Sequence, residues 1–223
     1  MDSAAALNEV EERIARVCKI AKRDADDVNL IAVSKTHPAE AIEPVLEAGQ
    51  RLFGENRVQE AQEKWPDLRA RYPDVELHLI GQLQSNKAED AAALFDVIHS
   101  LDRPSLLKAL AKAYDKLGKR VPCFIQVDVG EEDQKGGCAI PDLPALVEQA
   151  REAEIPLRGL MCIPPADKEP APFFALLGEL ARRHEPEPGV WGLSMGMSGD
   201  YETAIMLGAT HIRVGSALFG ARG

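Results

Sequence analysis

The chain has 223 residues, of which 45% are hydrophobic and 28% charged, and its net charge is −10. This composition is that of a globular protein, and the acidic balance argues against general binding to nucleic acid or to an anionic membrane surface. No apolar run approaches the ~18 residues that a membrane span needs. The N-terminal segment lacks the basic start and apolar middle of a signal peptide, so we expect a cytoplasmic protein.

Cysteine and histidine spacing gives no sign of a metal site. The four cysteines are Cys18, Cys123, Cys138 and Cys162. No two of them have the short spacing of a zinc or redox motif, so we expect free thiols in a reducing compartment. Three of the five histidines (His78, His99 and His211) fall on predicted strands, where we interpret them as core or rim residues. The sequence therefore predicts no metal ion.

Short apolar runs alternate with longer amphipathic runs along the chain, after a first helix expected at 4–23. Eight strands are expected, at 29–33, 51–53, 76–80, 97–100, 123–127, 157–162, 190–193 and 211–214. Helices are expected between them, at 39–48, 58–71, 87–94, 105–117, 144–152, 172–183 and 200–207. This strict alternation favours a parallel sheet with helical crossovers.

Eight such strands in ~220 residues match the lower end of the range for a (β/α)₈ TIM barrel. The rival is an open doubly wound sheet, whose nucleotide-binding form has a glycine-rich turn after the first strand. Here that turn reads SKTHP, which favours the barrel. We find no long linker, so we predict an α/β fold of one domain, 1–223, with an extra N-terminal helix.

Lys35 is the most informative single residue, because it follows the apolar run 30–33 after only one serine. A lysine at the carboxyl end of a buried strand lies at the rim of a core, where an amine is partly desolvated. Desolvation disfavours the ammonium form and leaves a nucleophile able to form a Schiff base with an aldehyde. The competing interpretation is a lysine that simply leaves the sheet into water.

Other polar residues follow the second and eighth strands. Asn56 comes at the end of the second strand, where it is either a hydrogen-bonding group of a site or a turn residue after Gly54. Arg213 lies between Ile212 and Val214, so we expect it to point into the barrel. Burying an unpaired arginine is costly, which predicts either an internal carboxylate or a bound cofactor as its partner.

The segments LSMGMSGD and VGS, at the ends of the seventh and eighth strands, have the composition of a phosphate cup. Ser198 is a candidate N-cap of the 200–207 helix, and Gly215 with Ser216 opens a short terminal turn. Loops after strands seven and eight are a frequent phosphate site in barrels of this kind. The alternative is that Ser198 only caps its helix.

Five segments together resemble the pyridoxal phosphate homeostasis protein family, also called proline synthetase co-transcribed proteins. They are AVSKTHP, FGENRVQE, HLIGQLQSNK, GLMCIPP and LSMGMSGDYETAIMLGATHIRVGSALFG. The resemblance implies the fold of the N-terminal barrel of alanine racemase and bacterial ornithine decarboxylase, the fold-type III pyridoxal enzymes. It also implies pyridoxal 5'-phosphate (PLP) as the cofactor, with Lys35 as its Schiff-base lysine.

The resemblance assigns roles to eight further positions. It implies that Ser198, Gly215 and Ser216 hold the phosphate of PLP. Arg213 would face the pyridine nitrogen, which it would keep unprotonated, because an arginine does not readily give up a proton. Asn56 would lie close to the ring and its 3-hydroxyl side. Ser194 and Met195 would line the cofactor, and Met161 would be part of the wall.

One segment, VDVGEEDQKGGC, departs from the family pattern. It has Asp128 and a pair of glycines where the family usually has an asparagine and a single glycine near a lysine. The conformation of this loop and a role for Lys135 are therefore left open.

The chain also ends at Gly223, directly after the eighth strand, where related racemases carry a further β domain that supplies a tyrosine acid/base. Of the tyrosines here, Tyr72 and Tyr114 fall late in helices, and only Tyr201 is expected nearer the site. We therefore expect a PLP carrier or homeostasis protein without strong catalytic activity. The alternatives are a PLP-dependent amino-acid racemase and a phosphate-binding barrel without covalent chemistry.

The expected partners are PLP itself and PLP-requiring apoenzymes that receive it, with no nucleic acid and no membrane. Loss of the racemase β domain, which forms part of a dimer interface, makes a monomer the expected state.

Overall fold

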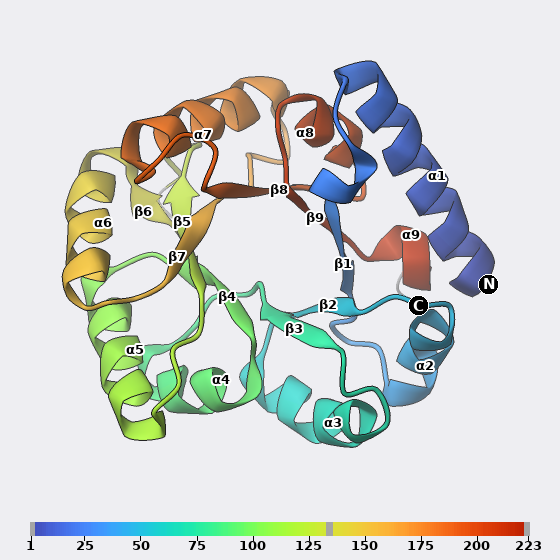
Figure 1. The fold of residues 1–223 in the computed structure, drawn as a ribbon, viewed down its shortest axis with the longest axis horizontal. Coiled ribbons are helices and arrows are strands. Elements are labelled where there is room, and N and C mark those ends of the chain that lie inside the picture. The colour runs from blue at the N-terminus through green and yellow to red at the C-terminus, as the bar shows by residue number, and fades with distance from the viewer. Residues whose placement is uncertain (1–2, 133–135, 221–223) are drawn as a thin grey trace.

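The computed structural model describes residues 3–132 and 136–220, and its centre is a closed barrel of eight parallel strands (Figure 1). Around the barrel the strands follow the order β4-β3-β2-β1-β9-β8-β7-β5, and pairing of β4 with β5 closes the ring. The strands are β1 (Asn29–Val33), β2 (Leu52–Glu55), β3 (Glu76–Leu79), β4 (Val97–Leu101), β5 (Cys123–Asp128), β7 (Leu157–Met161), β8 (Gly192–Met197) and β9 (His211–Val214). The predicted TIM barrel is confirmed.

Helices form a ring around the strands (Figure 1). They are α1 (Ser3–Ala21), α2 (Ala39–Glu47), α3 (Val58–Arg71), α4 (Ala88–Leu94), α5 (Pro104–Leu117), α6 (Leu143–Glu152), α7 (Ala171–His184), α8 (Tyr201–Met206) and the short α9 (Ser216–Phe219). Short 3-10 turns lie at Ala25–Asp27, Ser85–Lys87 and Ile140–Asp142. The extra N-terminal helix α1 packs against α8 and α9. No helix in the described part of the chain is long and apolar enough to cross a membrane.

Several strand bounds shift by one or two residues, and the two largest differences from the sequence prediction concern β8 and β6. β8 was expected at 190–193, but it runs from Gly192 to Met197, because the segment SMGM continues the pairing with β9 despite its serine and glycine. A two-residue strand, β6 (Cys138–Ala139), was not expected and pairs in parallel with the end of β5 outside the barrel. A segment of two residues carries no periodicity from which a strand could be predicted.

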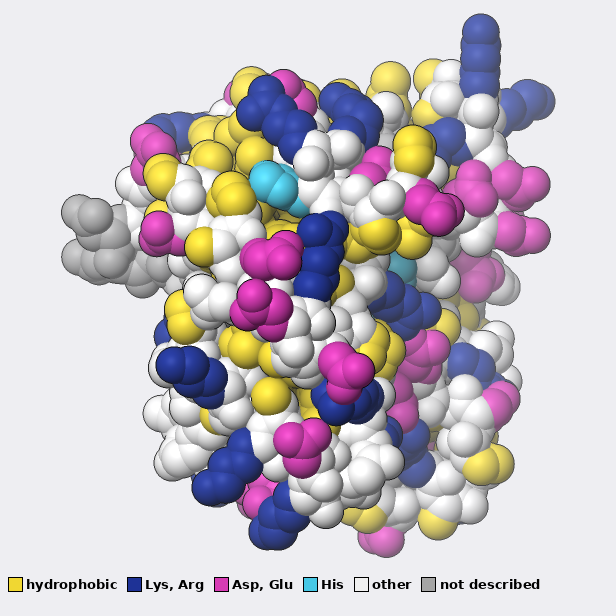
Figure 2. Space-filling model, turned by 60° about the vertical axis from the view of Figure 1, so that its left-hand side comes forward, with side chains coloured by type: hydrophobic (Ala, Val, Ile, Leu, Met, Phe, Trp, Pro, Cys, Tyr) yellow, Lys and Arg dark blue, Asp and Glu magenta, His cyan; other side chains and the backbone are white. Residues whose placement is uncertain are grey.

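The outer surface carries intermixed charges. On the face shown in Figure 2, Lys and Arg side chains alternate with Asp and Glu side chains, and hydrophobic side chains show between them. On this face the net negative charge is thus not gathered into one acidic patch.

The outer face of the barrel strands is apolar because helices cover it, whereas the inner face carries both apolar and polar side chains. Outside the barrel, side chains such as Ile212 and Val214 of β9 join the large core beneath the helices. Inside, Val97, Phe124 and Met161 form a small apolar cluster. The four cysteines are buried free thiols, as predicted.

Three histidines share the barrel interior with this small cluster. His78 and His99 have no exposed surface, and His211 is 5% exposed. The ring of Phe124 stacks on His99 at a centroid distance of 4.5 Å and meets His211 edge-on at 5.0 Å. The prediction that these histidines are core or rim residues is confirmed, and all three are buried. Burial lowers the pKa of all three, that of His211 to about 3.

The buried histidines predict acid sensitivity. His211 binds a proton below pH ~6.5 when unfolded but not until about pH 3 when folded, so the free energy of unfolding falls as pH drops through this window. Between pH 7 and pH 5 one such histidine accounts for about 2 kcal/mol. We expect His211→Asn to lose about 2 kcal/mol less than the unaltered protein over that range, measured by urea unfolding. Equal losses would contradict the burial argument.

Candidate functional site

A cavity of about 550 Å³ opens at the carboxyl ends of the barrel strands. Six of the nine predicted site residues line it: Lys35, Asn56, Ser198, Arg213, Gly215 and Ser216. They come from the ends of β1, β2, β8 and β9, which closure of the barrel brings to one mouth. Residues from opposite ends of the sequence therefore share one cavity.

Lys35 lies two residues after β1, half-buried, in a tight turn. The next residue, Thr36, has a φ of +66°, which is rare for a β-branched residue and must be imposed by its surroundings. The Nζ of Lys64 on α3 supplies part of that restraint, because it donates to the backbone oxygens of Ser34 (2.9 Å) and His37 (3.1 Å). These two bonds fasten the turn that carries Lys35 to α3.

Glu55, at the end of β2, is a buried carboxylate that binds the same turn through Ser34. Its Oε1 accepts from Ser34 Oγ at 2.6 Å and from Trp65 Nε1 at 3.0 Å, and it lies 2.8 Å from Lys64 Nζ. Glu55 has no exposed surface, and the Lys64 side chain is 9% exposed. Sequence reasoning missed this network, although a glutamate in the strand segment LFGE, which is otherwise apolar or glycine, was a visible signal.

Arg213 points into the barrel interior and is 4% exposed. Its Nη1 donates to Ser194 Oγ at 2.7 Å and its Nη2 donates to the backbone oxygen of Cys162 at 2.9 Å. Among the residues that the structure describes, no carboxylate lies within ion-pair distance of it, so the internal carboxylate considered from the sequence is not its partner. Burial lowers the pKa of Arg213, but a guanidinium still stays charged near neutral pH.

Ser198, Gly215 and Ser216 all line the cavity. The prediction that Ser198 caps α8 is wrong, because α8 begins after Asp200, whose Oδ1 accepts from the Met197 N–H at 2.6 Å. Ser198 Oγ instead accepts from the Gly215 N–H at 3.3 Å, which ties the β8 loop to the β9 loop. A hydroxyl of the β8 loop and a main-chain amide of the β9 loop thus meet at the cavity.

Three predicted residues do not line the cavity. Ser194 and Met161 lie inside the barrel, where Ser194 holds Arg213 and Met161 packs with Val97 and Phe124. Met195, one residue further along β8, is buried in the core beneath the helices. The proposed contacts of these three residues with a cofactor stay predictions.

The cavity also has lining residues outside the nine predicted site residues. They are mostly apolar or aromatic: Val33, His37, Ile80, Ile163 and Met197. His37 stacks on Phe219 of α9 at a centroid distance of 4.7 Å. Each lies at the end of a strand or within four residues after it, and that position was the signal that could have found them.

None of the three tyrosines lines the cavity. The Tyr114 hydroxyl donates to the backbone oxygen of Val121 at 2.8 Å, and burial raises its pKa. Tyr201 is 3% exposed, and its hydroxyl lacks a hydrogen-bond partner within the described chain. A tyrosine acid/base opposite Lys35 is therefore not found among the cavity residues.

The segment that departs from the family pattern is partly described. Asp128 accepts from the backbone N–H groups of Gly130 (3.3 Å) and Glu132 (3.0 Å). Gly137 has a φ of +144°, and a Cβ there would lie 2.6 Å from the Asp128 nitrogen, so a glycine is required. Lys135 lies outside the described residues.

Comparison with known proteins defines the class of this barrel. The family model of the alanine racemase N-terminal domain matches residues 6–223. An alanine racemase from Clostridium difficile shares the fold, with a TM-score of 0.70 and 16% identity over 95% of this chain and 56% of that one. The chain is thus a barrel of the alanine racemase N-terminal class.

More similar relatives narrow the class. The pyridoxal phosphate homeostasis protein of Pseudomonas aeruginosa is 43% identical over 97% of this chain and 94% of its own length, and that of Aquifex aeolicus is 39% identical over 100% and 99%. The structure of PipY from Synechococcus elongatus with PLP bound is 40% identical, with a TM-score of 0.82, covering 95% of this chain and 100% of that one. The chain belongs to the pyridoxal phosphate homeostasis protein family.

The Glu55–Lys64 pair yields a stability prediction. Lys64→Met leaves a buried carboxylate without its ammonium partner, which typically costs about 3–5 kcal/mol. We expect a loss of that order in the free energy of unfolding, measured by urea denaturation. The double variant Glu55→Gln/Lys64→Met removes both charges and should be less destabilised than Lys64→Met alone. A double variant at least as unstable as the single one would refute the pairing argument.

Proposed function

We propose that the chain binds PLP in this cavity as a Schiff base on Lys35 and serves PLP homeostasis, without strong catalytic activity of its own. The observation that carries the proposal is that one cavity gathers a lysine, a buried arginine and a cluster of hydroxyl and amide groups. These are the partners that an aldehyde, a pyridine nitrogen and a phosphate require.

The cavity residues fit PLP group by group. Lys35 supplies the amine for the aldehyde, and Ser198, Gly215 and Ser216 supply hydroxyl and main-chain groups for the phosphate. A Cβ at Gly215 would come within 3.2 Å of the Val33 backbone oxygen, so a glycine lets the β9 loop approach β1 closely. Asn56, which also lines the cavity, would hydrogen-bond on the 3-hydroxyl side of the ring.

Arg213 completes the fit, because it is buried at the cavity with only neutral oxygens as partners. A guanidinium there presents N–H donors, and the pyridine nitrogen is an acceptor. When bound, PLP supplies an electron sink, which an unprotonated ring nitrogen makes weaker. This arrangement favours holding the cofactor over strong carbanion chemistry.

Two further observations favour a carrier over a racemase. No tyrosine side chain lines the cavity to act as an acid/base opposite Lys35. The relatives named as homeostasis proteins are matched over 94–99% of their length, whereas the alanine racemase is matched over 56%. A PLP-dependent amino-acid racemase remains the second candidate because Lys35 itself could serve as one acid/base.

The cellular role follows from a cofactor that is held and released. We propose PLP-requiring apoenzymes as the recipients and a cytoplasmic, single-domain monomer as the carrier. Ile163 and Met197 at the cavity are each more than one third exposed, so the site is open to solvent. An open site suits exchange of the cofactor.

Replacing the Schiff-base lysine tests the binding mode. We expect purified protein to gain a visible absorbance band on addition of PLP, and Lys35→Ala to lose both the band and most of its PLP affinity, since the covalent link is gone. The matched control is Lys87→Ala, which removes a half-buried lysine that pairs with Asp90 in the segment after β3. Normal PLP retention with an unchanged band in Lys35→Ala would contradict the proposal.

A further inference from the structure

A chain of buried polar side chains starts at the cavity and runs into the barrel interior. Arg213 Nη1 donates to Ser194 Oγ at 2.7 Å, and that oxygen lies 2.9 Å from Nδ1 of His99. Nε2 of His99 lies 2.8 Å from Nδ1 of His78. Ser194, His99 and His78 have no exposed surface, so solvent does not compete for these bonds.

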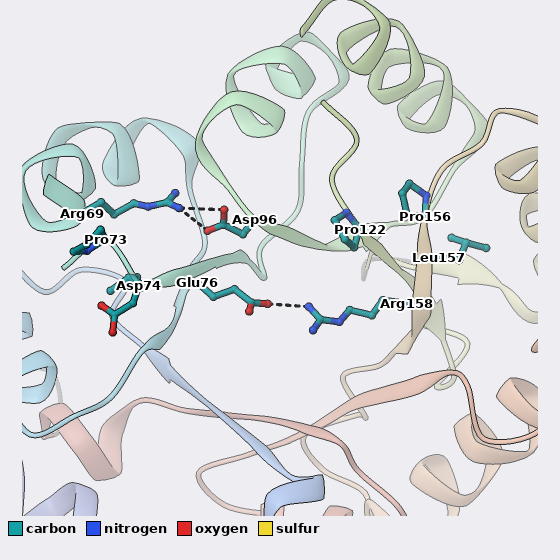
Figure 3. Close-up of a pocket in the computed structure, with 10 residues that line it drawn as sticks. Arg69, Pro73, Asp74, Glu76, Asp96, Pro122, Pro156, Leu157 and Arg158 are labelled. Carbon is teal, nitrogen blue, oxygen red and sulfur yellow. Dashed lines mark hydrogen bonds and ion pairs between the residues drawn. The ribbon is translucent and has the colours of Figure 1, made fainter. Parts of the chain in front are cut away.

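The chain ends at the opposite mouth of the barrel, on Glu76 at the start of β3. Nε2 of His78 lies 3.2 Å from Glu76 Oε1, a contact that does not meet the geometry of a full hydrogen bond, so this is the loosest link. The same oxygen accepts from Arg158 Nη1 at 2.8 Å. Figure 3 shows Glu76 and Arg158 pointing toward one another in the pocket that Arg69 and Asp96 also line.

The chemistry of Arg213 at one end and Glu76 at the other decides in which direction the hydrogen bonds between them donate. A guanidinium only donates and a carboxylate only accepts, while a neutral imidazole has one donor and one acceptor nitrogen. Burial lowers the pKa of His78 and His99, so both are neutral near pH 7. The reverse order of donors would leave a bare nitrogen of His78 facing the carboxylate of Glu76. Every bond therefore donates toward Glu76.

We propose that Glu76 is a positioning residue for Arg213, acting across the barrel through His78, His99 and Ser194. Because the Ser194 hydroxyl hydrogen is committed to His99, the lone pairs of its oxygen are left to accept from Arg213. This fixes the plane of the guanidinium at the cavity. The inference rests on the proposed function only in taking the PLP ring nitrogen as the group that Arg213 faces.

The test removes the acceptor at the far mouth with Glu76→Leu. In the full chain without PLP, nitrogen-15 NMR should find His78 and His99 of the unaltered protein both protonated at Nε2, with resolved N–H resonances for an immobilised Arg213. In Glu76→Leu we expect the His99 proton to divide between its two nitrogens and the Arg213 resonances to broaden. Affinity for added PLP should fall about fivefold, the equivalent of one hydrogen bond.

Two variants separate positioning from a general loss of stability. Glu76→Gln keeps an amide oxygen that accepts from His78 and should restore the NMR pattern. Asp96→Leu removes a carboxylate at the same mouth, which pairs with Arg69 and accepts from the Leu77 N–H. Asp96 is not part of the series of polar side chains that leads from Glu76 to Arg213. We expect Asp96→Leu to lower stability without changing the histidine tautomers or PLP affinity.

Unchanged tautomers and Arg213 resonances in Glu76→Leu, or equal changes in Asp96→Leu, would overturn the proposal. If Glu76→Leu does not fold, His78→Phe breaks the same link and is read by the same resonances of His99 and Arg213. These resonances are measured without the cofactor. Failure of the unaltered protein to bind PLP would therefore refute the proposed function and leave the NMR result to decide the role of Glu76.

Discussion

Closure of an all-parallel sheet is the constraint on which the rest of this structure depends. Because β4 pairs with β5 and every neighbouring pair runs the same way, all carboxyl ends of the strands meet at one mouth and all amino ends at the other. The first mouth gathers Lys35, Arg213 and the loops after β8 and β9. The second holds the Glu76–Arg158 pair. Each strand that spans the barrel is thus a physical link between the two mouths.

Alternation along each strand then decides which side chains can reach the site. On β9, Arg213 faces the barrel interior while its neighbours Ile212 and Val214 join the outer core. On β8, Ser194 faces inward and Met195 outward. Ser194, His99 and His78 have no exposed surface, so these polar groups must bond to one another in place of solvent. That requirement produces the chain from Arg213 to Glu76 and gives Ser194 a role through Arg213.

Sequence patterns predicted the barrel because they are local and repeated. The run 29–33 followed by Lys35 predicts a buried strand with a polar residue after its end, and β1 has these bounds. The bounds of β9 also agree with the prediction. What failed depended on contacts between distant segments. The prediction that Ser198 caps a helix is wrong, because its partner is Gly215 on the next loop, and the continuation of β8 beyond Leu193 is set by pairing with β9.

The restraint on Lys35 was also beyond local patterns. Glu55 and Lys64 lie on β2 and α3, and only the packing of α3 against the sheet brings their charged groups to the turn at 34–37. The sequence could place a lysine at a rim, but it could not show that a buried ion pair holds that rim in place. The Glu55–Lys64 pair and the series of polar side chains from Arg213 to Glu76 both contact site residues from the protein interior.

The most direct test of the account is to add PLP to the purified protein, reduce it with borohydride and locate the modified residue by peptide mass mapping. Borohydride converts only a Schiff base into a stable secondary amine. The account predicts one pyridoxyl phosphate group on the peptide that contains Lys35. A modification on another lysine, or no modification while PLP remains bound, would contradict it.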